Sequence, residues 1–251
     1  MQLIKAMPRR DFLAIGISLG GITLLSWLYL YSMASSMSMP MGAMQIQPWS
    51  AHYFLMMFLM WAIMMVGMML PSVAPTVLIY AAIARKAATG NTPVAPTGAF
   101  ISGYVVIWIA FSLFATTAQW ALDQAALLSP MMVSNSVGLG AVLIVTAGIY
   151  QWLPIKDKCL QQCRSPVDFI TSHWQKGMTG AFRMGLSHGM FCLGCCWVLM
   201  SLLFVGGVMN LLWIAAITLF VLLEKILPLG DAGGRVMGLI MIATGAIIAL
   251  V

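Results

Sequence analysis

Residues 49–72 read WSAHYFLMMFLMWAIMMVGMMLPS and contain no Asp, Glu, Lys or Arg. A helix needs about 20 mostly apolar residues to cross a hydrocarbon core of about 30 Å. We therefore expect a transmembrane helix here, from about Ser50 to Ala84. Pro71 and Pro75 lie inside it, and each proline removes a backbone hydrogen-bond donor. The prolines predict that this helix is kinked or broken.

The composition of the whole chain agrees with this first stretch. Of 251 residues, 62% are hydrophobic and only 7% are charged, with a mean hydropathy of +0.99. A soluble domain is about a quarter charged. The low charge excludes a disordered chain, a nucleic-acid-binding protein and a secreted disulfide scaffold. We expect a polytopic membrane protein.

Further apolar segments predict an all-α bundle of about seven spans in one domain. We divide it into an N-terminal helix (1–31), an outer loop (32–49) and a six-helix core (50–251). The seven spans are Phe12–Tyr31, Ser50–Ala84, Thr97–Leu122, Ser136–Leu153, Gly180–Val205, Met209–Leu227 and Arg235–Val251. The first segment follows Lys5, Arg9 and Arg10, so a cleaved signal peptide is the alternative there. Its length favours a retained helix.

Basic residues predict the orientation, because cytoplasmic loops are enriched in Lys and Arg. With the N-terminus in the cytoplasm, all 12 basic residues fall on the cytoplasmic side. These are Lys5, Arg9, Arg10, Arg85, Lys86, Lys156, Lys158, Arg164, Lys176, Arg183, Lys225 and Arg235. Topology thus accounts for the net charge of +6, and no nucleic-acid partner is needed to explain it.

The 23 methionines are as many as the glycines, an unusual excess. Some fall in the first outer loop, MASSMSMPMGAM. Thioether sulfur is a soft ligand that suits Cu(I), so the loop is a candidate copper-collecting segment. The alternative is a flexible apolar filler. The loop methionines are Met33, Met37, Met39, Met41 and Met44.

A second group of methionines forms a stripe on the predicted helix Ser50–Ala84. At 100° per residue, five of them occupy roughly one third of the helix circumference. They could pass a soft ion from site to site; the alternative is ordinary packing. His52 lies at the outer mouth. The stripe is Met56, Met57, Met60, Met64 and Met68, flanked by Met65 and Met69.

All five cysteines lie in two groups on the predicted cytoplasmic side. Cys159 and Cys163 belong to KDKCLQQCRSP, whereas Cys192, Cys195 and Cys196 belong to RMGLSHGMFCLGCCW. Cytoplasmic thiols stay reduced, which favours metal binding or redox chemistry over structural disulfides. Thiolates with an imidazole bind Cu(I) or Zn(II).

His188, Cys192 and Cys195 share one helical face, with Cys196 beside them and Met184 continuing the face. A histidine within a span is a functional candidate by default. The alternative is that the cysteines are small buried apolar residues and that His188 hydrogen-bonds a neighbouring helix.

Three other features have ordinary interpretations. Glu224 and Lys225 end the sixth span, where we expect a local ion pair or snorkelling. His173 has no evident partner. Gly185 and Gly189 have the G-x-x-x-G spacing typical of close helix packing.

These motifs carry a family resemblance. Four stretches resemble a bacterial family of uncharacterised, predicted metal-binding integral membrane proteins that carries a domain-of-unknown-function label. They are WAIMMVGMMLPSVAPTVLIYA, KDKCLQQCRSP, GMTGAFRMGLSHGMFCLGCCWVLM and FVGGVMNLLWIAAITLFVLLEKILP. The resemblance runs from about Trp61 to Leu229. It implies a multi-pass protein of the bacterial inner membrane with a metal site, and it implies no reaction. The outer methionine loop lies outside it.

The leading hypothesis is therefore a non-enzymatic Cu(I)-handling membrane protein. Outer methionines would collect the ion, the stripe would relay it, and the inner thiols with His188 would bind it for transport or for delivery to a membrane copper enzyme. Zinc is the alternative metal. We find no P-loop, so we expect no nucleotide partner.

Two further hypotheses stay open. One is an accessory or structural subunit of a larger membrane complex, without metal. The other is a thiol-redox protein that cycles Cys159 and Cys163 against Cys192 and Cys195.

Overall fold

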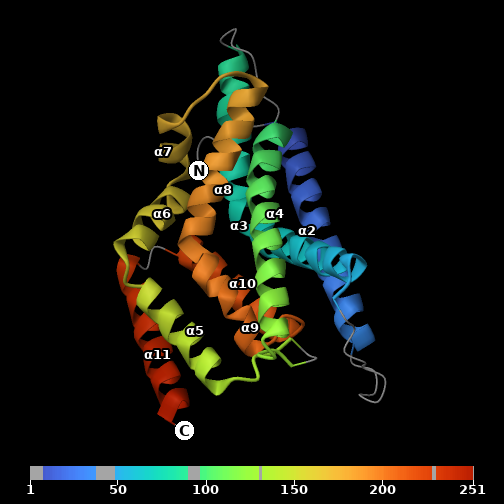
Figure 1. Cartoon of the computed structure of the whole chain (residues 1–251). Helices are drawn as coiled ribbons and strands as arrows, with labels where there is room; N and C mark the ends of the chain where they lie inside the picture. The colour runs from blue at the N-terminus through green and yellow to red at the C-terminus, as the bar shows by residue number, and fades with distance from the viewer. Residues whose placement is uncertain (1–7, 38–48, 90–96, 130–131, 228–229, 251) are drawn as a thin grey trace.

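The computed structural model describes residues 8–37, 49–89, 97–129, 132–227 and 230–250, and helices dominate them (Figure 1). No β-strand occurs in these ranges beyond one isolated bridge between Leu128 and Ser134, so the predicted all-α class is confirmed for them. The helices are α2 (Arg9–Met37), α3 (Ala51–Thr89), α4 (Thr97–Gln124), α5 (Val137–Tyr150), α6 (Pro154–Arg164), α7 (Pro166–Ser172), α8 (Gly177–Ser201), α9 (Leu203–Gly206), α10 (Leu211–Ile226) and α11 (Gly230–Leu250).

Five helical segments of the described chain are long and apolar enough to cross a membrane. A sixth is obtained if α5 and α6, which meet at a bend of 66°, form one broken span. The difference from seven lies mainly in α10, whose 16 residues fall short of the roughly 20 that a perpendicular crossing needs. Seven spans and their orientation stay predictions. The five are Arg9–Ser35, Ala51–Lys86, Thr97–Gln124, Gly177–Gly206 and Ala232–Leu250.

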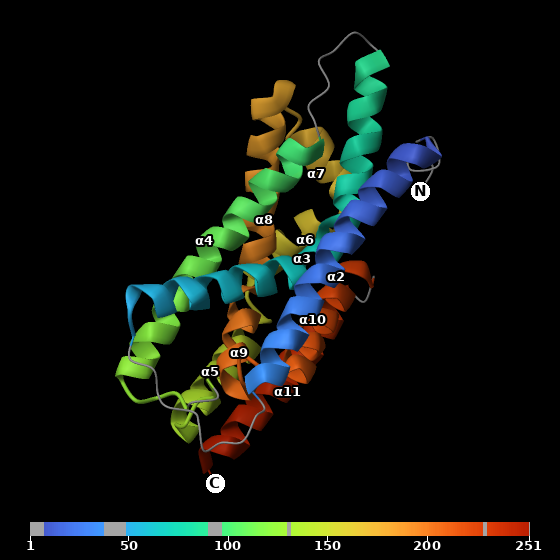
Figure 2. The same cartoon turned by 90° about the vertical axis from the view of Figure 1, so that its right-hand side faces the viewer.

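The helix α3 is continuous over 39 residues although it contains Pro71 and Pro75. Its two halves nevertheless run in different directions. In Figures 1 and 2 the first half runs across α4, and the second half turns away from that direction and rises. A helix interrupted at the prolines is therefore not seen. That the prolines themselves cause the change of direction stays a prediction.

Close approach of α4 and α8 forms the centre of the bundle. A Cβ added at Gly185 would overlap the carbonyl oxygen of Phe100, and one at Gly103 would overlap that of Phe182. Glycines at a helix crossing let the two backbones approach, which in a membrane improves van der Waals packing. The predicted role of Gly185 in close packing agrees with this geometry.

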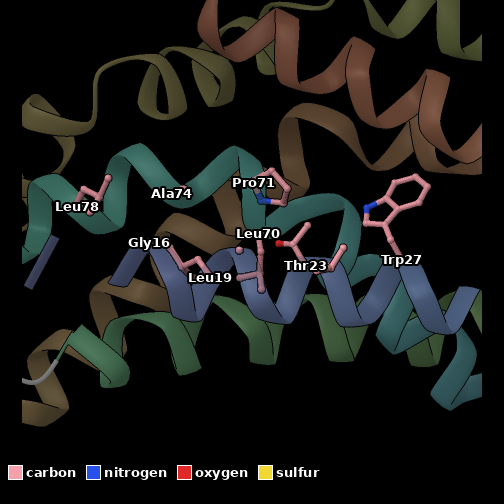
Figure 3. A pocket seen from close by; sticks show the side chains of 10 residues that line it. Gly16, Leu19, Thr23, Trp27, Leu70, Pro71, Ala74 and Leu78 are labelled. Carbon is pink, nitrogen blue, oxygen red and sulfur yellow. The ribbon is translucent and has the colours of Figure 1, made fainter. Parts of the chain in front are cut away.

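The helix α2 lies outside this centre and leaves an apolar groove of about 450 Å³ against α3 (Figure 3). Leu70 and Pro71 line it from α3, and Gly16, Leu19 and Trp27 line it from α2. The side of α3 that carries Pro71 thus faces an apolar surface. Ser72, the next residue of α3, makes polar contacts with Met69 and Lys225 instead.

A buried ion pair links the shorter helices. Lys156 of α6 contacts Glu224 of α10 at 2.6 Å, with side-chain exposures of 1% and 8%. Lys156 also donates to Gln151, and the Nε of Arg164 donates to the carbonyl oxygen of Glu224 at 2.8 Å. The predicted ion pair of Glu224 therefore exists, but its partner is distant in the chain rather than local. It fixes α6 against the end of α10.

Candidate metal centre

One face of α8 is directed into the protein rather than toward lipid. Its side chains are almost inaccessible: Cys192 and Cys195 are 1% exposed, and His188 is 2% exposed. Cys196 and Met184 are equally buried. The 3.6-residue period of the helix places these groups on adjoining turns. The structure thus gathers the soft side chains of α8 inside the bundle.

The helix α6 brings the second cysteine group to the first. The thiol of Cys163 interacts electrostatically with the thiols of Cys192 and Cys195. Cys159 packs closer to the backbone, with its Sγ 2.7 Å from the position that a Cβ on Gly194 would occupy. Cys163 therefore joins the α8 thiols, and Cys159 lies at their edge. All five cysteines are free thiols.

Cys192 belongs to a closed ring of polar contacts. Its Sγ lies 3.0 Å from the Nζ of Lys225 and 3.1 Å from the hydroxyl of Tyr104. Lys225 also donates to the Oγ of Ser72 at 3.0 Å. Ser72 and Tyr104 both donate to the carbonyl oxygen of Met69, at 2.9 and 3.3 Å. The ring joins α3, α4, α8 and α10 at a single thiol.

His188 lies among aromatic rings one turn from Cys192. The ring centroid of Phe169 is 4.8 Å from that of the imidazole, and those of Phe100 and Tyr104 are 6.0 Å away. Its Nδ1 is buried and has no hydrogen-bond partner among the described residues. In the tautomer that carries its proton on Nε2, this Nδ1 has a buried lone pair of the kind that a metal ion uses.

The thiols are gathered but are not yet arranged as ligands. In the described chain no three His, Cys, Asp or Glu side chains are placed to hold a metal ion together. The thiols of Cys195 and Cys196 instead donate to the carbonyl oxygen of Cys192, at 3.0 and 2.9 Å.

Most of the predicted methionine stripe lies in the core. Met60 and Met64 are fully buried, Met57 and Met68 are 2% exposed, and Met56 is 42% exposed. The stripe therefore packs in the protein interior except at its first member. Of the loop methionines, Met39, Met41 and Met44 lie outside the described residues, and Met37 is the last residue of α2. Their predicted role in copper capture stays a prediction.

Sequence reasoning missed three members of the ring. Lys225 was interpreted as part of a local pair or as a snorkelling side chain, yet it is 8% exposed and contacts Cys192. Tyr104 and Ser72 were not considered. A lysine followed by only two residues before a proline looks like an ordinary helix end. Its direction depends on how α10 packs against α8.

Comparison with known proteins gives one result. The family described as PpoB2, copper chaperone, matches residues 58–248, which include the thiols, His188, Lys225 and most of the methionine stripe. No curated protein and no solved structure matches the chain. The finding supports a copper-related family and a non-catalytic role. The chain belongs to the PpoB2 copper chaperone family.

Proposed function

We propose that this protein is a membrane-embedded Cu(I) carrier that binds the ion at Cys163, Cys192 and Cys195, with His188 as a further ligand. The observation that carries the proposal is the buried face of α8, where Cys192, Cys195 and His188 lie together and the sulfur of Cys192 is 3.0 Å from the ammonium group of Lys225. Thiolate and imidazole favour soft or borderline ions, and Cu(I) accepts thiolate and thioether ligands.

The position of Lys225 suits the charge of such a complex. With two of the three cysteines bound as thiolates and the third as a neutral thiol, the complex with one Cu(I) carries a net charge of −1. A buried charge is tolerated when an opposite charge is close, and the ammonium group of Lys225 lies 3.0 Å from the Cys192 sulfur. Copper would thus enter without leaving an unpaired charge in the bundle.

Zinc is less well supported as the cargo. Structural zinc sites use four ligands in a tetrahedral arrangement, whereas Cu(I) can be held by fewer soft ligands. The buried methionines of α3 add soft ligands that zinc does not prefer. A copper-carrying role agrees with the family description, and the carried ion would serve transport or delivery to a copper enzyme in the same membrane.

Metal analysis of the purified, detergent-solubilised protein tests the proposal. We expect Cu(I) bound in a competition titration against a colorimetric chelator, and X-ray absorption showing sulfur ligands. The double variant His188→Ala/Cys192→Ala should lose this binding. His173→Ala is the matched control for the histidine, and Met190→Leu on exposed α8 surface is the control for the helix.

Three outcomes would contradict the proposal. Equal copper content in the double variant and the parent would place the metal elsewhere. Metal-free, folded protein that co-purifies with a stoichiometric membrane partner would favour an accessory subunit. Alkylation mass shifts that change with redox potential would point instead to a thiol-redox protein.

A further inference from the structure

A buried amide collects two methionine sulfurs far from the cysteines in the chain. The Nε2 of Gln119 on α4 lies 3.3 Å from the Sδ of Met132 and 3.7 Å from the Sδ of Met57. Gln119 and Met57 are 2% exposed, and Met132 is 5% exposed. The two sulfurs belong to different parts of the chain, α3 and the connection between α4 and α5. They can be no farther apart than the sum of those two distances.

The other end of the amide is held firmly. Its Oε1 accepts a hydrogen bond from the indole Nε1 of Trp61 at 2.6 Å, and Trp61 is fully buried. The Nε2 therefore points at the sulfurs and cannot exchange places with the oxygen without losing the indole bond. Thioether sulfur is only a weak hydrogen-bond acceptor. The N–H groups of Gln119 therefore make only weak hydrogen bonds to the two sulfurs, and a stronger ligand of the sulfurs could replace the amide.

The backbone conformation of Met132 is energetically unfavourable for a residue that has a side chain. Its φ is +56°, a conformation that few residues other than glycine adopt. Strain of this kind persists where the surroundings impose it. Here the turn is closed by Met132 N donating to the carbonyl of Ser129 at 2.8 Å. Glycine would relieve the strain but would remove the sulfur.

We infer that Met57 and Met132 form a second soft-metal site, in which a Cu(I) ion replaces the Gln119 amide as the partner shared by both sulfurs. Two neutral thioethers suit this ion and not hard cations. Because the ion must displace the amide, the site exchanges its metal readily. Along α3, Met57 is followed by Met60, Met64 and Met68, so the site lies at the start of the stripe.

The predicted orientation places this site toward the outer side of the membrane, opposite the cytoplasmic loops. It would be the entry point for ions that the thiol centre later binds. Entry at this site would be a step that precedes the copper binding of the proposed function. The site itself rests on Gln119 and its two sulfurs, not on the cysteines.

Methionine-methyl NMR tests the inference directly. Protein labelled with ¹³C at the methionine methyls is titrated in detergent micelles with Ag(I), a redox-inert soft cation, through and beyond saturation of the thiols. Met57→Leu and Met132→Leu assign the two signals and nearly conserve volume. We expect the Met57 and Met132 signals to shift together, at one midpoint, before that of the exposed Met190.

The variants give a second readout that packing alone would not produce. In Met57→Leu the midpoint for the Met132 signal should rise at least about tenfold, about 1.4 kcal/mol of lost binding. Met190→Leu should leave it unchanged. Independent shifts of the two signals, or shifts only together with Met190, would overturn the site. If the titration showed no phase in which the thiols saturate, but the Met57 and Met132 signals still shifted together, the proposed thiol centre would be rejected and the methionine site would be supported.

Discussion

The ammonium nitrogen of Lys225 lies 3.0 Å from the sulfur of Cys192, although 33 residues separate them in the chain. The same ammonium donates to Ser72, which donates to the backbone of Met69. A cation buried beside a thiol stabilises the thiolate form, which is the form that binds metal. This relationship makes Lys225 a positioning and charge-balancing group of the candidate centre.

Removing the charge of Lys225 should weaken copper binding. A hydrogen bond to a charged group contributes about 1.5–3 kcal/mol, so Lys225→Met should lower Cu(I) affinity roughly ten- to hundredfold. Lys225→Arg, which keeps the charge, should retain more of it. Chelator competition measures both variants. If Met and Arg at this position lowered affinity equally, the role of Lys225 would be steric and not electrostatic.

The glycine crossing of α4 and α8 should be sensitive to a single methyl group. In Gly185→Ala the new Cβ meets the backbone of Phe100, and overpacking costs about 1–3 kcal/mol. The thermal midpoint in detergent should fall. Gly20→Ala on α2 is the control, because nothing lies within 4 Å of its added Cβ. A fall of the same size in both variants would show that the crossing is not the cause.

The Lys156–Glu224 pair should matter most when only one partner is removed. Breaking a buried pair costs about 3–5 kcal/mol because it leaves an uncompensated charge. Lys156→Met should therefore destabilise the protein strongly in denaturant titrations. The double variant Lys156→Met/Glu224→Leu should recover part of the loss. No recovery in the double variant would mean that the pair acts through packing rather than charge.

The methionine stripe should affect movement of copper more than its final binding. Replacing Met60, Met64 and Met68 by Leu conserves volume but removes three soft sulfurs. We expect slower loading of the thiol centre in reconstituted vesicles, with an unchanged equilibrium affinity in detergent. Stopped-flow loading measures the rate. Met56→Leu, at an exposed position, is the control, and equal rates in all proteins would reduce the stripe to core packing.

Much of the fold follows from local properties that the sequence displays. Long apolar segments predict membrane helices, because only a helix satisfies its backbone within lipid. The shared face of His188, Cys192 and Cys195 follows from the helical period alone. The number of spans is less certain from sequence, because α10 is apolar throughout but only 16 residues long, and hydropathy does not specify where a helix ends.

The candidate sites depend on contacts between distant segments. The amino-acid pattern predicts a membrane protein whose helices carry soft ligands, and it predicts which side chains share a face on α8. The packing of the helices shows in addition that Lys225 faces Cys192 and that Met57 and Met132 meet at Gln119. The physical reason is that periodicity orients a side chain around its own helix axis, whereas the partner it meets is set by how helices cross and how their connections run.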